Sequence, residues 1–327
     1  MLRGLNIRHR TLPLRAPFRI SRGVKHAADV MTVEIEQAGC VGRGESVPYA
    51  RYGESIASVT DEMEALRKDL CAGMGRDELQ LRLSAGAARN ALDAALWDLE
   101  SRLCRVPVSA RLARPPHSPV VTALTVSLDT PEEMEQAARR ITDARLIKVK
   151  VGADDPVARI EAVRRAAPSA KLIVDPNESW TMDILREALP ALERARVSLL
   201  EQPLRAGEDE ALLGFSSRIP ICADESCHTT SDLLPLLNRY QAVNIKLDKT
   251  GGLTEAWRLL HAAKGRGFRV MVGCMVCSSL GIAPALEIAR EAEFVDLDGP
   301  LWLQNDHAGG VRLQDGLLVP PEPGFWG

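Results

Sequence analysis

The stretch from Leu172 to Glu225 holds three short apolar runs that each end in an acidic residue: Leu172-Ile-Val-Asp175, Leu199-Leu-Glu201 and Ile221-Cys-Ala-Asp224. The acids are 26 and 23 residues apart, about the length of one strand and one helix. Apolar runs that alternate with helical patterns predict parallel strands joined by helices. Acids at the ends of such strands either cap the following helices or share an oxygen-ligand site of the kind that Mg²⁺ prefers. Their equivalent positions favour a metal site formed by Asp175, Glu201 and Asp224.

The same spacing continues through the rest of the chain after Pro119. Strand starts are expected near Val121, Leu146, Lys171, Val197, Ile219, Ala242, Arg269 and Phe294. Helical patterns between them begin near Pro131, Asp155, Met182, Glu208, Ser231, Leu253 and Ser278. Eight strands and seven helices predict an α/β protein with a (β/α)₇β TIM-like barrel. Active sites of such barrels lie at the carboxyl ends of the strands.

Residues 1–115 have a different pattern. Residues 31–36 alternate between apolar and polar, as a half-buried strand does, and helical patterns cover residues 55–70, 78–83 and 87–103. The proline-rich run from Arg114 to Pro119 predicts a linker. We therefore expect an α+β capping domain at residues 1–115 and the barrel at residues 116–305. The Gly- and Pro-rich tail, residues 306–327, is expected to pack against the capping domain.

The composition is that of an ordinary globular protein, with 46% hydrophobic residues and a net charge of −3. This charge gives no case for binding nucleic acid or a membrane surface. Seven cysteines, an odd number, lie mostly in apolar runs and predict a reduced, cytoplasmic protein. Cys274-Met-Val-Cys277 is not expected to be a redox or zinc site. The uncharged residues 270–286 are too short and too interrupted for a membrane span, and a homo-oligomer is compatible with the sequence.

Lysines flank the three acidic strands. Lys148 and Lys150 are two residues apart on one expected strand, so they point to the same face. A charged pair on the inner face of a barrel is costly unless it has a function, and adjacent cations lower the pKa of a lysine. This suits Lys150 as a general base. Lys246 ends its strand at the equivalent height, whereas the competing candidate Lys249 falls in the turn beyond it.

Taken together, these motifs resemble the muconate-lactonizing-enzyme subgroup of the enolase superfamily: Lys148-x-Lys150, Asp175-x-Asn177, Glu201-Gln-Pro203, Ala223-Asp-Glu225 and Asn244-Ile-Lys246-x-x-Lys-x-Gly-Gly252. The resemblance covers nearly the whole chain and includes Gly42-x-Gly-Glu45 and the helix that begins at Ala87. It implies one Mg²⁺ per subunit on the three acids. It also implies that Lys150 and Lys246 stand on opposite faces of the substrate α-carbon, where one removes a proton and the other returns it. Two such bases imply a racemisation or an epimerisation.

One position departs from the pattern of that family. Pro176 stands where members often have alanine. Proline lacks a backbone N–H, so the loop that carries Asn177 is open to a shift. The substitution removes no expected metal ligand.

The expected eighth strand carries Asp296-Leu-Asp298, whose acids share a face and would pair with a substrate ammonium. A helix cap or a surface pair is the alternative. Asp296-x-Asp298-Gly-Pro is similar to the pattern of dipeptide epimerases, in which the pair holds the N-terminal amine. Further runs are similar to proteobacterial members that interconvert L-Ala-L-Glu and L-Ala-D-Glu, and so imply murein peptide recycling: residues 51–55, 221–228 and 244–255. N-acylamino acid racemases, cycloisomerases and o-succinylbenzoate synthases on the same scaffold stay as alternatives.

A glutamate side chain in the substrate should meet a basic residue of the protein. Capping-domain loops close over the site in this family, so Arg22 is the candidate, with three alternatives: Arg19, Lys25 and Arg51. Strand position also brings Lys148, Thr125 and Cys274 to the barrel mouth as substrate contacts. For Thr125 and Cys274, simple packing is an equal expectation.

Overall fold

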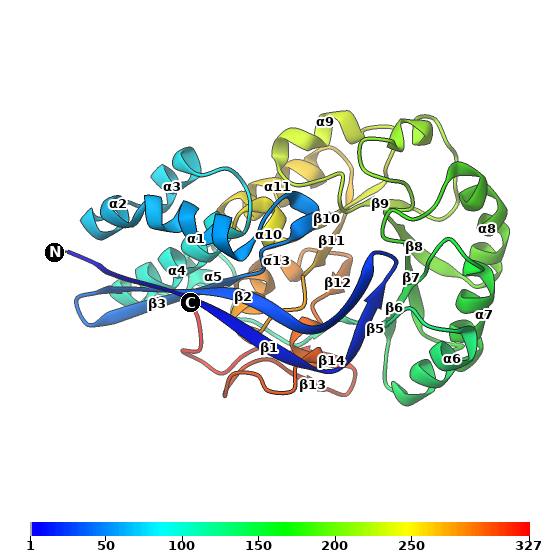
Figure 1. The fold of residues 1–327 in the computed structure, drawn as a ribbon, viewed down its shortest axis with the longest axis horizontal. Helices are drawn as coiled ribbons and strands as arrows, with labels where there is room; N and C mark the ends of the chain where they lie inside the picture. The colour runs from blue at the N-terminus through cyan, green and yellow to red at the C-terminus, as the bar shows by residue number, and fades with distance from the viewer. Residues whose placement is uncertain (1) are drawn as a thin grey trace.

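The N-terminal part of the chain is an antiparallel sheet covered by helices. The structure is a computed structural model that describes residues 2–327. The sheet has the order β1-β2-β3, with β1 (Gly4–Ile20), β2 (Gly23–Gln37) and β3 (Cys40–Ser46). The helices are α1 (Ile56–Ala65), α2 (Arg67–Ala72), α3 (Arg76–Arg82), α4 (Ala87–Cys104) and α5 (Val108–Arg111). The long β1–β2 hairpin extends from this part toward the barrel (Figure 1).

Two glycines let β3 lie directly on α4. A Cβ at Gly42 or Gly44 would collide with the α4 backbone at Ala95 or Ala91. On the neighbouring β2, the alternation of residues 31–36 buries Met31, Val33 and Ile35 in the same core as the α4 leucines. The predicted half-buried strand is therefore present, and the Gly-x-Gly spacing has a packing cause.

The second part is a nearly closed barrel of eight parallel strands in chain order. They are β5 (Ala123–Val126), β6 (Leu146–Lys150), β7 (Lys171–Asp175), β8 (Val197–Glu201), β9 (Ile221–Ala223), β10 (Ala242–Ile245), β11 (Arg269–Gly273) and β12 (Phe294–Asp296). The edges β5 and β12 meet through two hydrogen bonds. Leu297 N donates to Thr122 Oγ1 (2.9 Å), and Thr125 N donates to Asp298 Oδ2 (2.7 Å). The α/β barrel with an N-terminal capping part is thus confirmed.

The expected helices were only partly right. Long helices follow the first three barrel strands, β5 to β7, and also β10. They are α6 (Pro131–Arg140), α7 (Pro156–Ala166), α8 (Met182–Arg194) and α11 (Leu253–Gly265). The remaining segments are short: η2 (Asp209–Leu212), η3 (Thr230–Asp232), α9 (Leu233–Leu236), α10 (Leu247–Thr250), α12 (Ser279–Ile282), η4 (Ala283–Ala285), α13 (Leu286–Ala289) and η5 (Gly299–Trp302). Because α12, η4 and α13 follow one another without a gap, the helix expected near Ser278 is present as one run of helical turns from Ser279 to Ala289. The helix expected near Glu208 is wrong because Gly207 and Gly214, both left-handed, leave room for only one turn. The helix expected near Ser231 stops at Asn238, which is also left-handed (φ 64°).

The start of the first barrel strand also needs correction. Residues Val120–Val121 form β4, which pairs with β14 (Leu317–Val319) rather than with the barrel. Together with β13 (Arg312–Gln314) they make a small antiparallel sheet. Beyond it, the tail contacts the N-terminal part, since Trp326 Nε1 donates to Arg43 O (3.0 Å) and Gly327 N donates to Asp98 Oδ1 (2.9 Å).

Three buried carboxylates join the N-terminal part to the barrel. Glu45 accepts hydrogen bonds from Ser278 N (2.7 Å) and Oγ (2.6 Å). Asp248 accepts from Val47 N (2.9 Å) and Asn90 Nδ2 (2.8 Å). Asp93 accepts from its barrel partner in the same way, through Thr254 N (3.0 Å) and Thr254 Oγ1 (2.6 Å). Burial raises the pKa of Glu45 and Asp248 to about 7 and that of Asp93 to about 6.

These carboxyl groups should make stability depend on pH. Their pKa values are higher in the folded chain than the ordinary 3.8 to 4.5, so the folded state binds protons more tightly. Their contribution to stability is therefore fully present below about pH 4 and is lost as the pH rises to about 7. Glu45→Gln should make the decline shallower by a few kcal/mol at most, since one pKa unit is about 1.4 kcal/mol. Urea unfolding of both proteins from pH 4 to 8 measures this, and parallel curves would contradict it.

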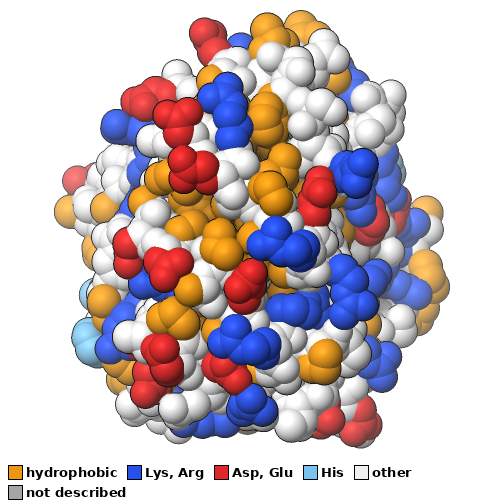
Figure 2. Space-filling model, turned by 90° about the vertical axis from the view of Figure 1, so that its right-hand side faces the viewer, with side chains coloured by type: hydrophobic (Ala, Val, Ile, Leu, Met, Phe, Trp, Pro, Cys, Tyr) orange, Lys and Arg blue, Asp and Glu red, His pale blue; other side chains and the backbone are white. Residues whose placement is uncertain are grey.

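On the face formed by the barrel helices, basic and acidic side chains are interspersed around apolar ones (Figure 2). Among residues 2–327, no helix is both long enough and apolar enough to cross a membrane.

Candidate active site

The barrel interior is arranged in layers that follow the two-residue period of the strands. One apolar residue from each strand fills the lower layer: Ala123, Leu146, Ile173, Leu199, Cys222, Ala242, Met271 and Phe294. Side chains two residues further along a strand point to the same interior. At that height stand mainly polar residues: Thr125, Lys148, Asp175, Glu201, Asp224, Asn244, Gly273 and Asp296. The apolar layer is therefore the floor on which the predicted site residues come together.

Lys148 lies among the acids of this upper layer. Its Nζ is 3.1 Å from Asp175 Oδ2, 2.7 Å from Glu201 Oε2 and 2.8 Å from Asp296 Oδ2. Burial lowers the pKa of Lys148, but Asp296, Glu201 and Asp175 outweigh burial and raise the pKa well above its usual value. Lys148 is therefore held as a cation, and its ion pairs with the three carboxylates offset the cost of burying its charge.

Lys150 and Lys246 face the cavity from two separated strands. Three strands, β7 to β9, lie between β6 and β10 in the barrel order. Lys150 Nζ is 2.6 Å from Asp175 Oδ2, and Lys246 Nζ is 2.6 Å from Asp224 Oδ2. Burial lowers the pKa of Lys246, but Asp224 outweighs it and raises the pKa above the ordinary value. Each lysine thus carries its own carboxylate partner, on opposite sides of Glu201.

Lys249 has a supporting position that sequence reasoning missed. Its ammonium is almost fully buried and donates to Cys227 O (2.8 Å) and Asn244 O (2.9 Å) as well as to Asp224 O. It also lies 2.7 Å from Asp224 Oδ1. These carbonyls use up its donors, so Lys249 positions Asp224 from behind. In the sequence, only the position of Lys249 just beyond the strand indicates a role near the site. That position does not indicate that the side chain is buried.

Amide side chains hold the three acids in place. Asn177 donates to Asp175 through N (2.8 Å) and Nδ2 (3.1 Å), so the chain past Pro176 still supports this acid. Asn244 Nδ2 donates to Glu201 Oε1 (2.8 Å). Gln202 Oε1 accepts from the backbone N of Asp224 (2.8 Å). These contacts explain the amides of the Asp-x-Asn, Glu-Gln-Pro and Asn-Ile-Lys motifs.

The donor chemistry of Asp175, Glu201 and Asp224 fits a hard divalent cation. Among residues 2–327, Glu201 Oε2 and Asp224 Oδ1 are buried and accept no hydrogen bond, although lysine ammonium groups lie at ion-pair distance. Burial and the nearby Asp175 raise the pKa of Glu201 to about 8, so the pocket favours added positive charge there. As they stand, no three acidic, His or Cys side chains of the described chain converge on one point. Lysine ammonium groups lie between the acids.

Asp296 and Asp298 lie at the cavity wall formed by β12 and the residues after it. Asp298 Oδ2 accepts from Thr125 N (2.7 Å) and Trp302 Nε1 (3.3 Å). Burial and the neighbouring Asp296 raise the pKa of Asp298 to about 6. Asp296 Oδ1 is buried and accepts no hydrogen bond from residues 2–327. The pair thus has acceptor capacity for a cationic ligand, and Thr125 contributes a backbone N–H to it.

A cavity of about 480 Å³ lies between the barrel mouth and the β1–β2 hairpin. This volume is typical of small-molecule sites. Both parts of the chain line it, the barrel through Thr125, Lys148, Lys150, Asn177, Glu225, Lys246, Cys274, Met275, Val276, Asp296, Asp298 and Gly299. The capping part contributes Phe18, Ile20, Arg22, Gly23, Val24, Lys25, Tyr49, Ala50, Arg51 and Tyr52.

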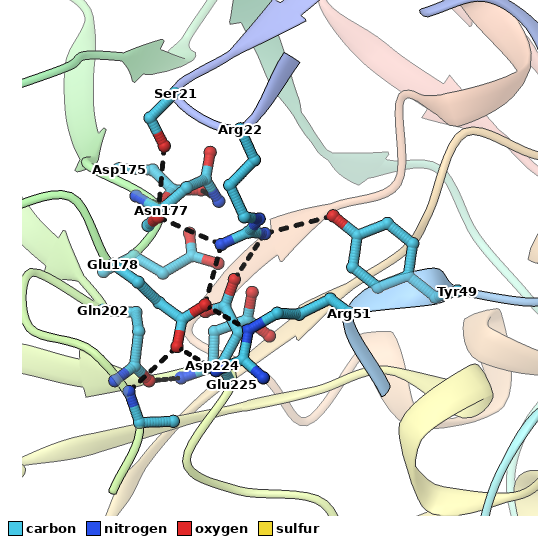
Figure 3. Close-up of polar contacts among 12 residues, drawn as sticks. Ser21, Arg22, Tyr49, Arg51, Asp175, Asn177, Glu178, Gln202, Asp224 and Glu225 are labelled. Atoms are coloured by element: carbon cyan, nitrogen blue, oxygen red, sulfur yellow. Dashed lines mark hydrogen bonds and ion pairs between the residues drawn. The ribbon is translucent and has the colours of Figure 1, made fainter. Parts of the chain in front are cut away.

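Ion pairs fasten the capping loops to the barrel (Figure 3). Arg22, at the β1–β2 turn, lies 2.7 Å from Glu225 Oε1 and 3.0 Å from Glu178 Oε2. Arg51 also pairs with Glu178 (2.6 Å), and Ser21 Oγ donates to Asn177 O (3.1 Å). The sequence did not indicate that Glu178 and Glu225 pair with the capping loops, because these ion pairs join residues more than 120 positions apart.

The other basic candidates differ in position. Arg19 pairs with Asp129 (2.8 Å), half-exposed, and does not belong to the cavity lining given above. Lys25 lines the cavity, and its Nζ is 5.0 Å from the centre of the Tyr49 ring. Arg22, Lys25 and Arg51 therefore form the basic wall of the cavity.

Two family models match the two parts of the chain. The model described as enolase C-terminal domain-like matches residues 132–325, and that of the mandelate racemase / muconate lactonizing enzyme N-terminal domain matches residues 2–112. The chain is 45% identical to the L-Ala-D/L-Glu epimerase of Escherichia coli (strain K12), over 97% of this chain and 99% of that protein. It is 47% identical to the N-acetyl-D-glutamate racemase of a Pseudoalteromonas species, over 91% and 95%.

Solved structures are similar over the whole chain. An enolase family member from Agrobacterium tumefaciens with bound sodium and L-Ala-L-Glu has a TM-score of 0.97 and 45% identity, covering 99% of this chain and 100% of that one. A dipeptide epimerase from Enterococcus faecalis complexed with Mg and L-Leu-L-Tyr has a TM-score of 0.90 and 29% identity, with coverage of 98% and 97%.

Proposed function

Because the chain belongs to the mandelate racemase / muconate lactonizing enzyme family of the enolase superfamily, we propose that it is an L-Ala-D/L-Glu epimerase. It interconverts L-Ala-L-Glu and L-Ala-D-Glu by moving the α-proton of the glutamate residue. The observation that carries this proposal is that Lys150 and Lys246 face one cavity from opposite sides of Asp175, Glu201 and Asp224. A single base would serve a lyase equally well, whereas two opposed bases suit inversion.

Lys150 and Lys246 are the acid and the base of the reaction. Whichever lysine faces the α-hydrogen removes it as a neutral amine, and the other, as an ammonium, returns a proton to the opposite face. Burial at the barrel mouth and ion pairs with Asp175 and Asp224 fix both side chains within the cavity. Positioning of this kind is what keeps the two proton transfers on one carbon atom.

Asp175, Glu201 and Asp224 hold one Mg²⁺ per subunit. The oxygen donor set and the two buried oxygens without hydrogen bonds support this, as does the Mg complex of the Enterococcus faecalis relative. Bound there, Mg²⁺ supplies Lewis-acid stabilisation of negative charge on the substrate carboxylate. Lys148, protonated between Asp175 and Glu201, adds a fixed positive charge at the same carboxylate.

The remaining contacts of the substrate follow from charge. Asp296 and Asp298 accept hydrogen bonds from its N-terminal ammonium. Thr125 and Cys274 border this subsite. Arg22 and its basic neighbours stand at the side-chain carboxylate.

This substrate places the enzyme in the recycling of peptidoglycan peptides. All seven cysteines are free, which fits a cytoplasmic setting. Assembly as a homo-oligomer stays a prediction.

N-acetyl-D-glutamate racemase is the second candidate, favoured by the 47% identity to that Pseudoalteromonas enzyme. Its substrate has the same side chain but no ammonium.

For the wild type, kcat/KM for L-Ala-L-Glu should exceed that for N-acetylglutamate by about 10- to 100-fold, the size of a charged hydrogen bond. Asp298→Asn should remove most of this preference while it keeps an acceptor for Thr125 N. Chiral chromatography of both reactions measures it, and faster turnover of N-acetylglutamate by the wild type would favour the racemase.

A further inference from the structure

The helix α4 of the capping part carries three polar side chains that reach the barrel. Arg89, Asn90 and Asp93 are all buried. Each of them contacts one segment of the barrel, residues 247–254, which directly follows Lys246. Burying a polar or charged group is costly unless its hydrogen bonds are made. In α4 these hydrogen bonds are made with the segment that begins beside a proposed catalytic lysine.

Arg89 donates to carbonyls at the ends of two short helices. Its Nη2 donates to Thr250 O (2.7 Å) and its Nε to Gly251 O (3.1 Å), at the C-terminal end of α10. Its Nη1 donates to Leu83 O (3.0 Å) and Gln80 O (3.4 Å), at the end of α3. Basic side chains often bind the free carbonyls at such ends, and within residues 2–327 Arg89 makes no ion pair. Arg89 thus fastens the backbone of α10 to the capping part.

Asp248 gives α10 a second attachment to the capping part. Asn90 Nδ2 donates to Asp248 Oδ1 (2.8 Å), and Val47 N donates to the same oxygen (2.9 Å). Both donors belong to the capping part, whereas Asp248 lies within α10. The short helix is therefore held through a side chain as well as through its terminal carbonyls.

Two glycines allow the segment after α10 to lie close to α4. Gly251 and Gly252 have positive φ angles (69° and 110°), a conformation that favours glycine. A Cβ at Gly251 would collide with Arg89, and one at Gly252 would collide with Asp93. Asp93 then accepts from Thr254 N (3.0 Å). The Gly-Gly pair therefore fits this backbone against the polar side chains of α4.

The backbone of Lys246 is tied to α10. Its carbonyl accepts from Lys249 N (3.0 Å) and Thr250 N (3.0 Å). Among residues 2–327 its ammonium donates to a single acceptor, Asp224 Oδ2 (2.6 Å), so the place of the ammonium depends on the backbone that carries it. The Lys249 ammonium is instead fixed by three carbonyls of its own. A looser α10 should therefore displace Lys246 more than it disturbs the support of Asp224.

The segment after Lys150, the other proposed base, is held by the barrel. Lys150 ends β6 and pairs in register with Asp175 of β7. Val151 N donates to Asp175 O (3.2 Å), and Gly152 O accepts from Trp180 Nε1 (2.9 Å). All of these residues belong to the barrel. The two lysines thus differ in which part of the chain fixes their backbone.

We propose that Arg89 and Asn90 are positioning residues for Lys246, so that α4 sets the geometry of proton transfer on one face of the substrate. Neither residue belongs to the cavity lining given above, and both act through α10. The inference rests on the proposed epimerase function and deepens it, because it gives the capping part a role in the chemistry of one lysine.

The test follows exchange of the glutamate α-proton by NMR in D₂O with the Mg²⁺-loaded enzyme, starting from L-Ala-L-Glu and from L-Ala-D-Glu. Lys246→Ala identifies the epimer whose proton Lys246 removes. Arg89→Met should lower exchange of that epimer about 10- to 100-fold, the cost of misplacing a reacting group by about 1 Å. Exchange of the other epimer should change less than about 3-fold. Arg89→Lys, which keeps the charge and some donors, should recover part of the loss.

Two further variants keep the test decisive. Asn90→Ala serves if Arg89→Met does not fold, and should give a one-sided loss of about 3- to 10-fold, the size of one hydrogen bond. Arg82→Met removes a more exposed arginine of α3, which pairs with Asp69, and should leave both exchange rates unchanged. Calorimetric titration should show the wild-type Mg²⁺ affinity in Arg89→Met and in Asn90→Ala.

Equal losses for the two epimers, no loss for either, or a weakened Mg²⁺ affinity would each overturn the proposal, because a general loosening of the site would then explain the result. If the Mg²⁺-bound wild type exchanges neither dipeptide, the proposed function fails. The same comparison with the two enantiomers of N-acetylglutamate then tests Arg89 and Asn90 separately.

Discussion

Replacing either Lys150 or Lys246 by alanine is expected to lower kcat for epimerisation about 10²- to 10⁴-fold, the usual contribution of a positioned acid or base. In the proposed mechanism each lysine serves one face of the α-carbon, so the loss of either stops inversion in both directions. KM should change little, because Lys148, Asp296 and the metal site stay in place. Polarimetry from L-Ala-L-Glu and from L-Ala-D-Glu measures the two rates.

The lowered rates can be assigned to the loss of an acid or a base only if the variants are folded. Each of these variants removes the partner of a buried acid, Asp175 or Asp224, so thermal unfolding should be recorded alongside the rates. Lys171→Ala is the matched control, since Lys171 is an exposed lysine at the start of β7. Wild-type epimerisation in either active-site variant would remove that lysine from the mechanism.

Loss of a metal ligand is expected to have an effect of similar size. Asp175→Asn, Glu201→Gln and Asp224→Asn each remove a negative oxygen donor from the proposed Mg²⁺ site. The metal accounts for several kcal/mol of charge stabilisation, so kcat/KM should fall about 10³-fold or more. Calorimetric titration with Mg²⁺ should show a weaker affinity in each variant, a readout independent of turnover.

Chelation offers a reversible form of the same test. EDTA should abolish activity of the wild type, and added Mg²⁺ should restore it. Asp183→Asn, at an exposed acid of α8, serves as the control. Undiminished Mg²⁺ affinity in all three ligand variants would show that the cation binds elsewhere.

The strand period explains why much of the site was predictable from the sequence. On a parallel strand, residues two apart share a face, so one apolar floor residue places the next polar residue at the barrel mouth. This placed Lys148 above Leu146 and Glu201 above Leu199. Local patterns cannot predict that Gly207 and Gly214 shorten a helix to one turn, because helical periodicity and turn signals overlap in so short a segment.

The lid contacts were beyond sequence reasoning for a different reason. Glu178 and Glu225 follow barrel strands, whereas Arg22 and Arg51 belong to the capping part, and nothing local links them. The sequence suggested Arg22 for the substrate side chain because of its loop. In the structure, four of the five N–H donors of Arg22 are engaged with other residues of the protein. Pairing between distant segments, which sets the charge available to a ligand, is visible only in the fold.

The most direct test of the two-base account follows the glutamate α-proton by NMR in D₂O with Mg²⁺. The wild type should introduce deuterium into both L-Ala-L-Glu and L-Ala-D-Glu and interconvert them. Lys150→Ala and Lys246→Ala should each exchange the α-proton of only one epimer, without inversion, and the two variants should act on opposite epimers. Exchange of the same epimer by both variants, or no exchange by the Mg²⁺-bound wild type, would contradict the account.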